Sequence, residues 1–318
     1  MATYREVKGY SIKSVSSDPA NIKEGQIWYN SSAKKIKVAP KIAAWSSGEN
    51  LQSAVRGNRA TGTQTAGLSA FGQEPGGVQT KSQEYDGTDW ASNVNANTAR
   101  AYMASFGIQT ASSFAGGYNT SGAAVNTTET YDGSSFSEGT ALNTARWYNA
   151  GAGTNTAAVV FLGVTPGSVV ANVEEWNGSS WSEVTDNPTA RRHGDGLGTQ
   201  TAALAAGGLP NTRVTSEEYD GTNWTAGGDL NTGRAYLQGF GTLTAGLVCG
   251  GNAGGSASTA TEEYDGTSFS ATAALSAARN DGGGTGGSNI SGLYAGGGPT
   301  HTNATEEFSK AATTRSVD

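Results

Sequence analysis

The stretch Glu84-Tyr85-Asp86-Gly87-Thr88-Asp89-Trp90 returns later in the chain as Glu218-Tyr219-Asp220-Gly221-Thr222-Asn223-Trp224. An aromatic residue occupies the same frame six times, at Tyr85, Tyr131, Trp176, Tyr219, Tyr264 and Phe308. The steps between these aromatic residues are 46, 45, 43, 45 and 44 residues. Most of the 318-residue chain is therefore a set of six repeats, each of about 45 residues.

Each repeat contains four short segments with strand character. In the second repeat these are residues 100–107, 110–115, 128–132 and 136–137. The Asp-Gly pair before the fourth segment is a strong hairpin signal, because glycine adopts positive φ without a steric cost. No apolar pattern with a period of 3.6 residues reaches a useful length. We therefore predict an all-β protein in which each repeat forms one blade of a β-propeller.

The two ends of the repeat region complement each other. After Phe308 the expected turn and tryptophan are missing, whereas Trp45 precedes Arg56 by 11 residues, much as Trp90 precedes Arg100 by 10. We expect the strand around Trp45 to complete the last blade and to remove the open edge of the ring. The prediction is a six-bladed β-propeller over residues 45–308, with residues 1–44 as a separate N-terminal segment and residues 309–318 as a C-terminal tail.

The repeat resembles the kelch-type β-propeller. The resemblance rests on the Tyr and Trp on either side of a Gly turn, on the period, and on Gly-Gly pairs after the second strand, at 116–117, 207–208, 250–251 and 296–297. The turn before the fourth strand is shorter than the usual kelch turn, and Phe136 and Phe269 replace Trp. Enzymes, adaptors and adhesins share this pattern, so it indicates the fold better than the function.

The N-terminal segment has a different texture. Its stretch Glu24-Gly25-Gln26-Ile27-Trp28-Tyr29-Asn30, followed by Lys34-Lys35-Ile36-Lys37-Val38, reads as a β-hairpin. It resembles a hairpin of virion structural and tail-associated proteins of tailed phages, notably those of marine cyanobacteria. An ordinary β-hairpin with a Tyr-Asn turn is the plain alternative.

The phage resemblance implies a location and a set of partners. The protein would be a non-enzymatic structural protein of the phage tail or fibre, made in the host cytoplasm without a signal peptide. Residues 1–44 would bind other virion proteins, the propeller would serve assembly or bind a host-surface glycan or protein, and the chain would be a homo-oligomer in the particle. The alternative is a cellular kelch-like adaptor or lectin that binds a protein or a glycan.

Composition argues against several other classes. The net charge of −7 disfavours a surface that follows nucleic-acid phosphates, which needs clustered Lys and Arg. Cys249 is the only cysteine, which excludes an internal disulfide and a multi-cysteine metal site. No apolar run approaches 18 residues and no secretory signal is visible, so we expect no membrane insertion.

The recurring charged and aromatic residues can be interpreted as binding residues or as structural residues. An arginine begins each repeat, and the six form either a cationic ring for an acidic glycan or ion pairs with glutamates before the third-strand aromatics. Recurrence in every repeat favours pairing, because a binding site normally breaks symmetry. The glutamates expected as partners are Glu84, Glu129, Glu175, Glu218, Glu263 and Glu307. We likewise expect the Tyr and Trp residues to pack between blades rather than stack on sugars.

We find no constellation of catalytic, cofactor-binding or metal-binding residues. His193 and His301 are the only histidines and fall in different repeats, unlike the ligand set of a copper oxidase. Asp86 is followed directly by Gly87, which breaks the spacing of a sialidase Asp box. His193, beside Arg191 and Arg192, reads as part of a solvated loop. The sequence therefore predicts a protein without enzymatic activity or cofactor.

The loops between the second and third strands vary from repeat to repeat. Rigid scaffolds often carry binding residues on variable loops of one face. Small polar and aromatic side chains on these loops suit hydrogen bonding to sugar hydroxyls, with plain surface loop as the simpler reading. The candidate binding residues are Tyr118, Asn119, Asn211, Arg213, Asn252 and His301.

Overall fold

The computed structural model describes residues 12–211, 213–312 and 314–317. Its secondary structure over these residues consists of β-strands without a helix, which confirms the all-β prediction. None of the described segments is thus a helix long and apolar enough to cross a membrane. The chain divides into two compact units, one of residues 45–309 and one of residues 1–44 together with 310–318.

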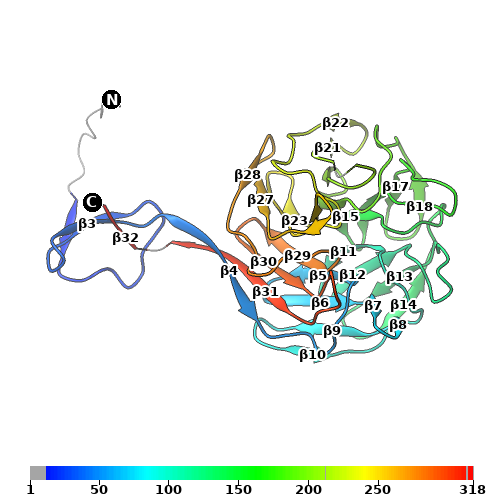
Figure 1. Cartoon of the computed structure of the whole chain (residues 1–318), viewed down its shortest axis with the longest axis horizontal. Helices are drawn as coiled ribbons and strands as arrows, with labels where there is room; N and C mark the ends of the chain where they lie inside the picture. The colour runs from blue at the N-terminus through cyan, green and yellow to red at the C-terminus, as the bar shows by residue number, and fades with distance from the viewer. Residues whose placement is uncertain (1–11, 212, 313, 318) are drawn as a thin grey trace. The chain divides into compact units, whose positions relative to one another are not determined.

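In the described part of the chain, six four-stranded sheets carry the repeats, and we number them in chain order (Figure 1). Sheet 1 consists of β5 (Arg59–Thr63), β6 (Ala66–Ala70), β9 (Ser82–Tyr85) and β10 (Trp90–Ser92). Sheet 2 consists of β11 (Ala104–Ile108), β12 (Ala111–Ala115), β13 (Thr128–Tyr131) and β14 (Phe136–Gly139). Sheet 3 consists of β15 (Ala150–Thr154), β16 (Ala157–Phe161), β17 (Glu174–Trp176) and β18 (Trp181–Glu183).

Sheets 4 to 6 repeat this order. Sheet 4 consists of β19 (Asp195–Thr199), β20 (Ala202–Ala206), β21 (Ser216–Tyr219) and β22 (Trp224–Ala226). Sheet 5 consists of β23 (Gln238–Thr242), β24 (Ala245–Cys249), β27 (Thr261–Tyr264) and β28 (Phe269–Ala271). Sheet 6 consists of β29 (Gly283–Ser288), β30 (Ser291–Ala295), β31 (Thr305–Ala312) and β4 (Lys41–Gly48). Two small hairpins lie in the variable loops, β7 (Gln73–Glu74) with β8 (Gly77–Val78) and β25 (Asn252–Ala253) with β26 (Ser256–Ala257).

The first strand of each sheet lies nearest the centre about which the sheets are grouped (Figure 1). Strand β5 contacts β11, β11 contacts β15, and the contacts continue through β19, β23 and β29 back to β5. These strands are rich in glycine because neighbouring backbones approach closely: a Cβ added at Gly196 would lie 3.0 Å from the Gly151 carbonyl oxygen.

Sheet 6 joins the two ends of the repeat region, as the sequence predicts. Strand β4 lies beside β31, and the ring centroids of Trp45 and Phe308 are 5.2 Å apart. The Trp45 Nε1 group donates to Thr261 Oγ1 of sheet 5 at 3.1 Å. The same contact recurs elsewhere, since Trp181 Nε1 in sheet 3 donates to Thr128 Oγ1 in sheet 2 at 3.2 Å.

The core lies between adjacent sheets. One cluster contains Leu68 and Phe71 of the first repeat with Phe114, Tyr131 and Phe136 of the second. Full burial of one such side chain contributes roughly 2–3 kcal/mol. The expected packing of the Tyr and Trp residues between neighbouring repeats agrees with these clusters, and Cys249 is also buried.

The smaller unit is one sheet, β1 (Lys13–Val15), β2 (Ile27–Asn30), β3 (Lys35–Val38) and β32 (Arg315–Val317). Strands β2 and β3 form the expected hairpin, and β1 runs parallel to β2. Trp28 is buried, and its Nε1 group donates to Asp18 Oδ1 at 2.9 Å. The expected C-terminal tail, residues 309–318, needs correction: β31 continues to Ala312 and β32 pairs with β3, because backbone pairing needs no apolar pattern.

Candidate functional site

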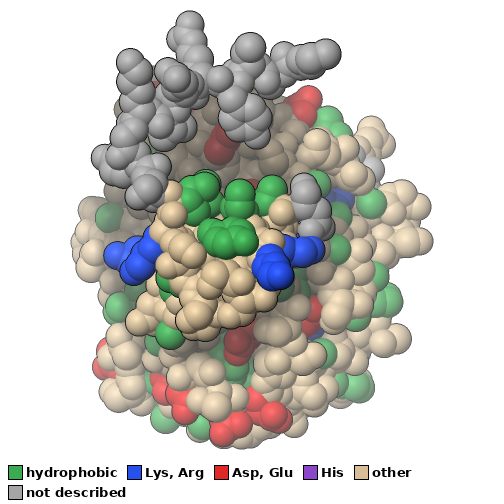
Figure 2. Space-filling model, turned by 90° about the vertical axis from the view of Figure 1, so that its left-hand side faces the viewer, with side chains coloured by type: hydrophobic (Ala, Val, Ile, Leu, Met, Phe, Trp, Pro, Cys, Tyr) green, Lys and Arg blue, Asp and Glu red, His purple; other side chains and the backbone are tan. Residues whose placement is uncertain are grey.

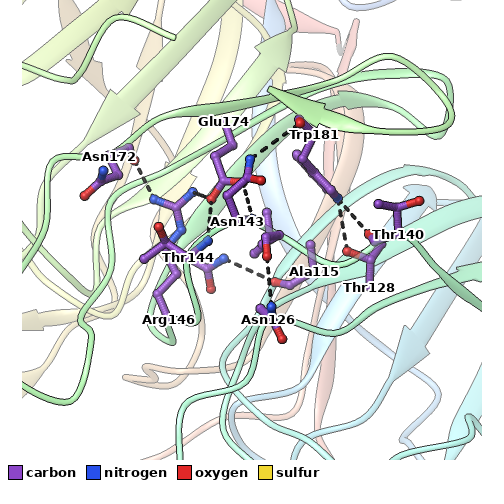
Figure 3. Close-up of polar contacts among 12 residues, drawn as sticks. Ala115, Asn126, Thr128, Thr140, Asn143, Thr144, Arg146, Asn172, Glu174 and Trp181 are labelled. Carbon is purple, nitrogen blue, oxygen red and sulfur yellow. Dashed lines mark hydrogen bonds and ion pairs between the residues drawn. The ribbon is translucent and has the colours of Figure 1, made fainter. Parts of the chain in front are cut away.

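Buried ion pairs hold the link that enters each of sheets 2 to 6. In Figure 3 the Glu174 carboxylate lies among Asn143, Thr144 and Arg146. It accepts the backbone N–H groups of Asn143 at 2.7 Å and Thr144 at 3.3 Å and the Arg146 guanidinium at 3.0 Å. The side chains of Arg146 and Glu174 are both 0% exposed. These arginines are therefore structural, and the reading as paired residues is confirmed.

The predicted partner of most of these arginines is wrong by one residue. Within the described residues, the buried pairs are Arg100–Glu129, Arg146–Glu174, Arg191–Glu217, Arg234–Glu262 and Arg279–Glu306. Of the expected partners only Glu129 is correct, and Glu175, Glu218, Glu263 and Glu307 follow the paired residue. In the first repeat Gln83 occupies the paired position, and the Arg56 guanidinium lies 3.5 Å from Gln73 Oε1 instead of binding Glu84.

The glutamate that directly precedes a third-strand aromatic residue binds the neighbouring sheet. The Tyr219 hydroxyl donates to Glu175 at 3.0 Å, and the Tyr131 hydroxyl donates to Glu84 at 2.8 Å. Where the aromatic residue is Trp176, which has no hydroxyl, the preceding repeat carries Thr130 instead of glutamate. The two glutamates therefore have separate roles, one within a repeat and one between repeats.

A ring of backbone hydrogen bonds surrounds the axis, one turn before the innermost strands. The Gly57 N–H donates to Asp281 O, the Tyr102 N–H to Gly57 O, and the same bond links Tyr148, His193, Tyr236 and Asp281 in turn, at 2.6–3.2 Å. The six bonds return to the starting residue. All six residues have left-handed backbone conformations, with φ between 55° and 64°.

The side chains of this ring form an aromatic arc. Tyr118 stacks on Tyr102 with ring centroids 5.6 Å apart, and Tyr102 meets Tyr148 at 4.8 Å. His193 lies between Tyr148 and Tyr236, at centroid distances of 3.6 and 3.9 Å. Its burial, with Arg192 nearby, lowers the pKa of His193 to about 2. His193 is thus a buried neutral ring member, and its assignment to a solvated loop is wrong.

The arc borders a cavity of about 350 Å³, which we call the mouth cavity. It is lined by Arg56, Tyr102, Tyr148, Tyr236, Asn252, Asn280, Asp281 and Pro299. Burial raises the pKa of Asp281 to about 7, although Arg59 and Arg56 oppose the shift. The lining is mainly polar and combines three tyrosine rings with amide, carboxylate and guanidinium groups, which can fix the orientation of a small ligand.

The structure brings only part of the predicted binding set to this cavity. Asn252 lines it and Tyr118 stacks on one of its tyrosines. Asn119 Oδ1 instead accepts the Ser121 and Ala123 N–H groups of its own turn. Asn211 and Arg213 belong to the loop of the fourth repeat and do not line the cavity. His301 is not part of the lining either, and burial, together with the charge of Arg56, lowers its pKa.

The sequence reasoning missed the tyrosines of the mouth. Tyr102, Tyr148 and Tyr236 each stand two residues after a recurring arginine, and Asp281 holds the same place in the last repeat. This regular position was a usable signal. Among the described residues, no group of three or more His, Cys, Asp or Glu is placed to hold a metal ion.

Comparison with known proteins assigns neither a family nor a function to this chain. No protein-family model matches the chain, and a search of curated proteins finds no match either. Similarity to a characterised protein therefore does not identify the ligand of the mouth cavity.

Proposed function

We propose that residues 45–309 form a six-bladed, kelch-type β-propeller closed by β4. Two observations support this architecture. The contacts between innermost strands return from β29 to β5, and the backbone hydrogen bonds of the mouth return from Asp281 to Gly57. In a propeller the loops at one end of the axis surround a shared opening, which is where the mouth cavity would lie.

We further propose that the protein is a non-enzymatic virion structural protein, associated with a phage tail or fibre. The observation that carries this proposal is the separate unit built from both chain ends, which contains the phage-like Glu24–Asn30 stretch. This unit would attach the chain to the particle and the propeller would be displayed for host-surface binding. The mouth cavity is lined by one carboxylate among the described residues, Asp281, whereas glycoside hydrolysis generally uses two.

The two units differ in charge, which suits separate partners. Residues 1–44 and 310–318 contain ten Lys or Arg and four Asp or Glu, a net charge of +6. Residues 45–309 contain ten Lys or Arg and 23 Asp or Glu, a net charge of −13. A basic attachment unit favours an acidic partner surface, while an acidic propeller stays soluble when displayed.

The attachment unit also exposes apolar side chains. Ile27 is 51% exposed and Val317 is 49% exposed, and Ile36 lies between their strands on β3. Lys35 and Lys37 alternate with Ile36 and so belong to the opposite face of the sheet. Figure 2 shows hydrophobic side chains gathered on one face, with Lys and Arg on either side. An exposed apolar patch of this kind is typical of an interaction surface.

Mass spectrometry of purified phage particles tests the proposal directly. We expect peptides of this chain in intact virions, at a stoichiometry similar to that of known tail components. Its absence from extensively purified particles would end the virion assignment.

A second candidate function is a cellular kelch-like adaptor or lectin, and the mouth cavity favours it independently of the attachment unit. Genes for tail or baseplate proteins beside the coding sequence would support the virion protein, and their absence would favour the cellular one. Incubation of the purified protein with a panel of glycans tests the non-enzymatic assignment, because cleavage of any of them would contradict it.

A further inference from the structure

The backbone ring at the mouth does not need side chains. Gly57 makes the same hydrogen bonds as the other five members, with a φ of 64°. Glycine adopts this conformation freely, whereas a bulky residue with positive φ is a strained outlier. Tyr102, Tyr148 and Tyr236 nevertheless occupy three of the positions, with φ between 56° and 60°. Strain of this kind is found at functional sites when surrounding structure holds it.

Of the three tyrosines, Tyr102 is buried, whereas the other two keep part of their surface exposed. Tyr148 and Tyr236 are half-buried and line the cavity. No hydrogen bond within the described residues uses the hydroxyl groups of Tyr102, Tyr148 or Tyr236. Gly57 leaves room for the Tyr102 ring, because a Cβ added at Gly57 would lie 2.6 Å from Tyr102 Cζ. The rings therefore pack partly against one another and His193, while their unpaired hydroxyl groups remain available to a ligand in the cavity.

The mouth also departs from the repeat. The ring positions hold Gly, three Tyr, His and Asp, whereas the buried Arg–Glu pairs recur in five repeats. A residue retained in each repeat serves the scaffold, and a position that differs between repeats can serve a single asymmetric ligand. In the order of the backbone ring, Asp281 and Gly57 are neighbours, and the four positions between them hold Tyr102, Tyr148, His193 and Tyr236.

We propose that the mouth cavity binds a small saccharide, with its C–H face against the rings of Tyr148 and Tyr236. The sugar hydroxyls would exchange hydrogen bonds with Asn252, Asn280 and Asp281, and Arg56 would donate to a ring or hydroxyl oxygen. An amphipathic aromatic ring offers both an apolar face and a polar edge, which matches a sugar. This inference rests on the proposed host-surface binding and names the ligand class for it.

A peptide ligand fits the same cavity less well. Two common modes of peptide binding add a strand to a free sheet edge or place apolar side chains in a hydrophobic groove. The lining contains no aliphatic side chain other than Pro299 among the described residues, and amide, hydroxyl and charged groups dominate it. The cavity of about 350 Å³ is also at the small end of ligand sites.

The test uses the full-length protein with Tyr148→Gly and Tyr236→Gly, singly and together. We expect wild-type protein to bind members of a panel of immobilised mono- and disaccharides, and each variant to lose at least about tenfold in affinity for the same sugars, as for truncation of an aromatic anchor. Glycine relieves the left-handed backbone but also removes the ring contacts with His193, so the melting temperature of each variant measures the structural cost separately from sugar binding. This combination separates a ligand role from a structural one.

Lys34→Gly is the matched control. Lys34 has a φ of 54° in the β2–β3 turn and lies outside the mouth cavity, so the same backbone relief should leave sugar binding unchanged. Tyr148→Phe and Tyr236→Phe, which keep the ring and remove the hydroxyl, should retain part of the affinity.

Three results would overturn the proposal: no saccharide bound by the wild-type protein, binding unchanged in the double glycine variant, or binding at this site only to members of a parallel peptide library. None of these outcomes depends on whether the chain is found in virions. Failure here is therefore distinct from failure of the virion assignment.

Discussion

Two adjacent glutamates in β17 have different structural roles. Glu174 is buried and neutralises Arg146, whereas Glu175 is only partly buried and accepts the Tyr219 hydroxyl. Loss of one partner of a buried ion pair leaves an uncompensated charge. We therefore expect Glu174→Gln to lower the free energy of unfolding by about 3–5 kcal/mol, measured by urea denaturation.

Glu175→Gln is the control in the same strand. Its amide oxygen still accepts the Tyr219 hydroxyl, so the cost should stay below about 1 kcal/mol. Equal costs for the two variants would contradict the assignment of separate roles.

The protonation of Asp281 makes the free energy of unfolding depend on pH. Its pKa rises from 3.8 to about 7 in the folded protein because burial disfavours the carboxylate. The stability contributed by the protonated form is present below about pH 4 and is lost as the pH rises through about 7. Asp281→Asn should therefore match the wild type near pH 4 and be the more stable protein near pH 8. A difference in unfolding free energy that stays constant over this range would show that another group titrates.

At the scale of strands and turns, the sequence predicts well what the repeat itself encodes. The Asp-Gly turns, present in four of the six repeats, and the recurring strands follow from local preferences. The innermost strand of sheet 2 begins at Ala104, however, although the apolar residues after Arg100 predict a strand from Arg100 onward. The intervening turn places Tyr102 at positive φ without a glycine to mark it. The mouth was missed because tertiary hydrogen bonds, rather than residue preference, impose that turn.

The partners of the buried arginines were misplaced for a related reason. A Glu-Glu pair precedes four of the six aromatic residues in the third strands, so pattern alone leaves the choice of partner open by one residue. The two repeats with a single glutamate do not decide the choice either, because Glu84 holds the second place and Glu129 the first. Register across the strands decides such a choice, since a shift of one residue reverses the face.

The strand β4 gives a prediction for a whole element. Deletion of residues 1–50 removes β4 and with it the contact between Trp45 and Phe308, which leaves β31 as an open edge. An unpaired edge strand invites association with other chains. We expect calorimetry to show loss of a single cooperative transition, or aggregation at lower temperature. Deletion of residues 1–40, which retains β4, should preserve the transition. A cooperative transition in both truncated proteins would show that β4 is not needed for closure.

For the whole molecule, the division into a basic and an acidic unit predicts that deletion of one unit removes attachment to the particle without removing ligand binding. The attachment unit includes β32 as well as the N-terminal strands, so its removal requires deletion of residues 1–40 and 313–318 together. The remaining chain keeps the six repeats, β4 and the mouth cavity. We expect it to melt like the propeller of the full chain and to bind the same saccharides, because no residue of the cavity lining is removed.

The same truncated protein should fail to join phage particles when it replaces the full-length chain during infection, as measured by its abundance in purified virions. Loss of the exposed Ile27, Ile36 and Val317 removes the apolar surface, and loss of Lys35 and Lys37 removes part of the positive charge. A full-length Ile27→Lys, Ile36→Lys double variant isolates the apolar contribution, with Ile108→Lys, an exposed isoleucine of β11, as its matched control. Normal incorporation of the truncated chain would place the attachment surface on the propeller, since the remaining residues would then suffice.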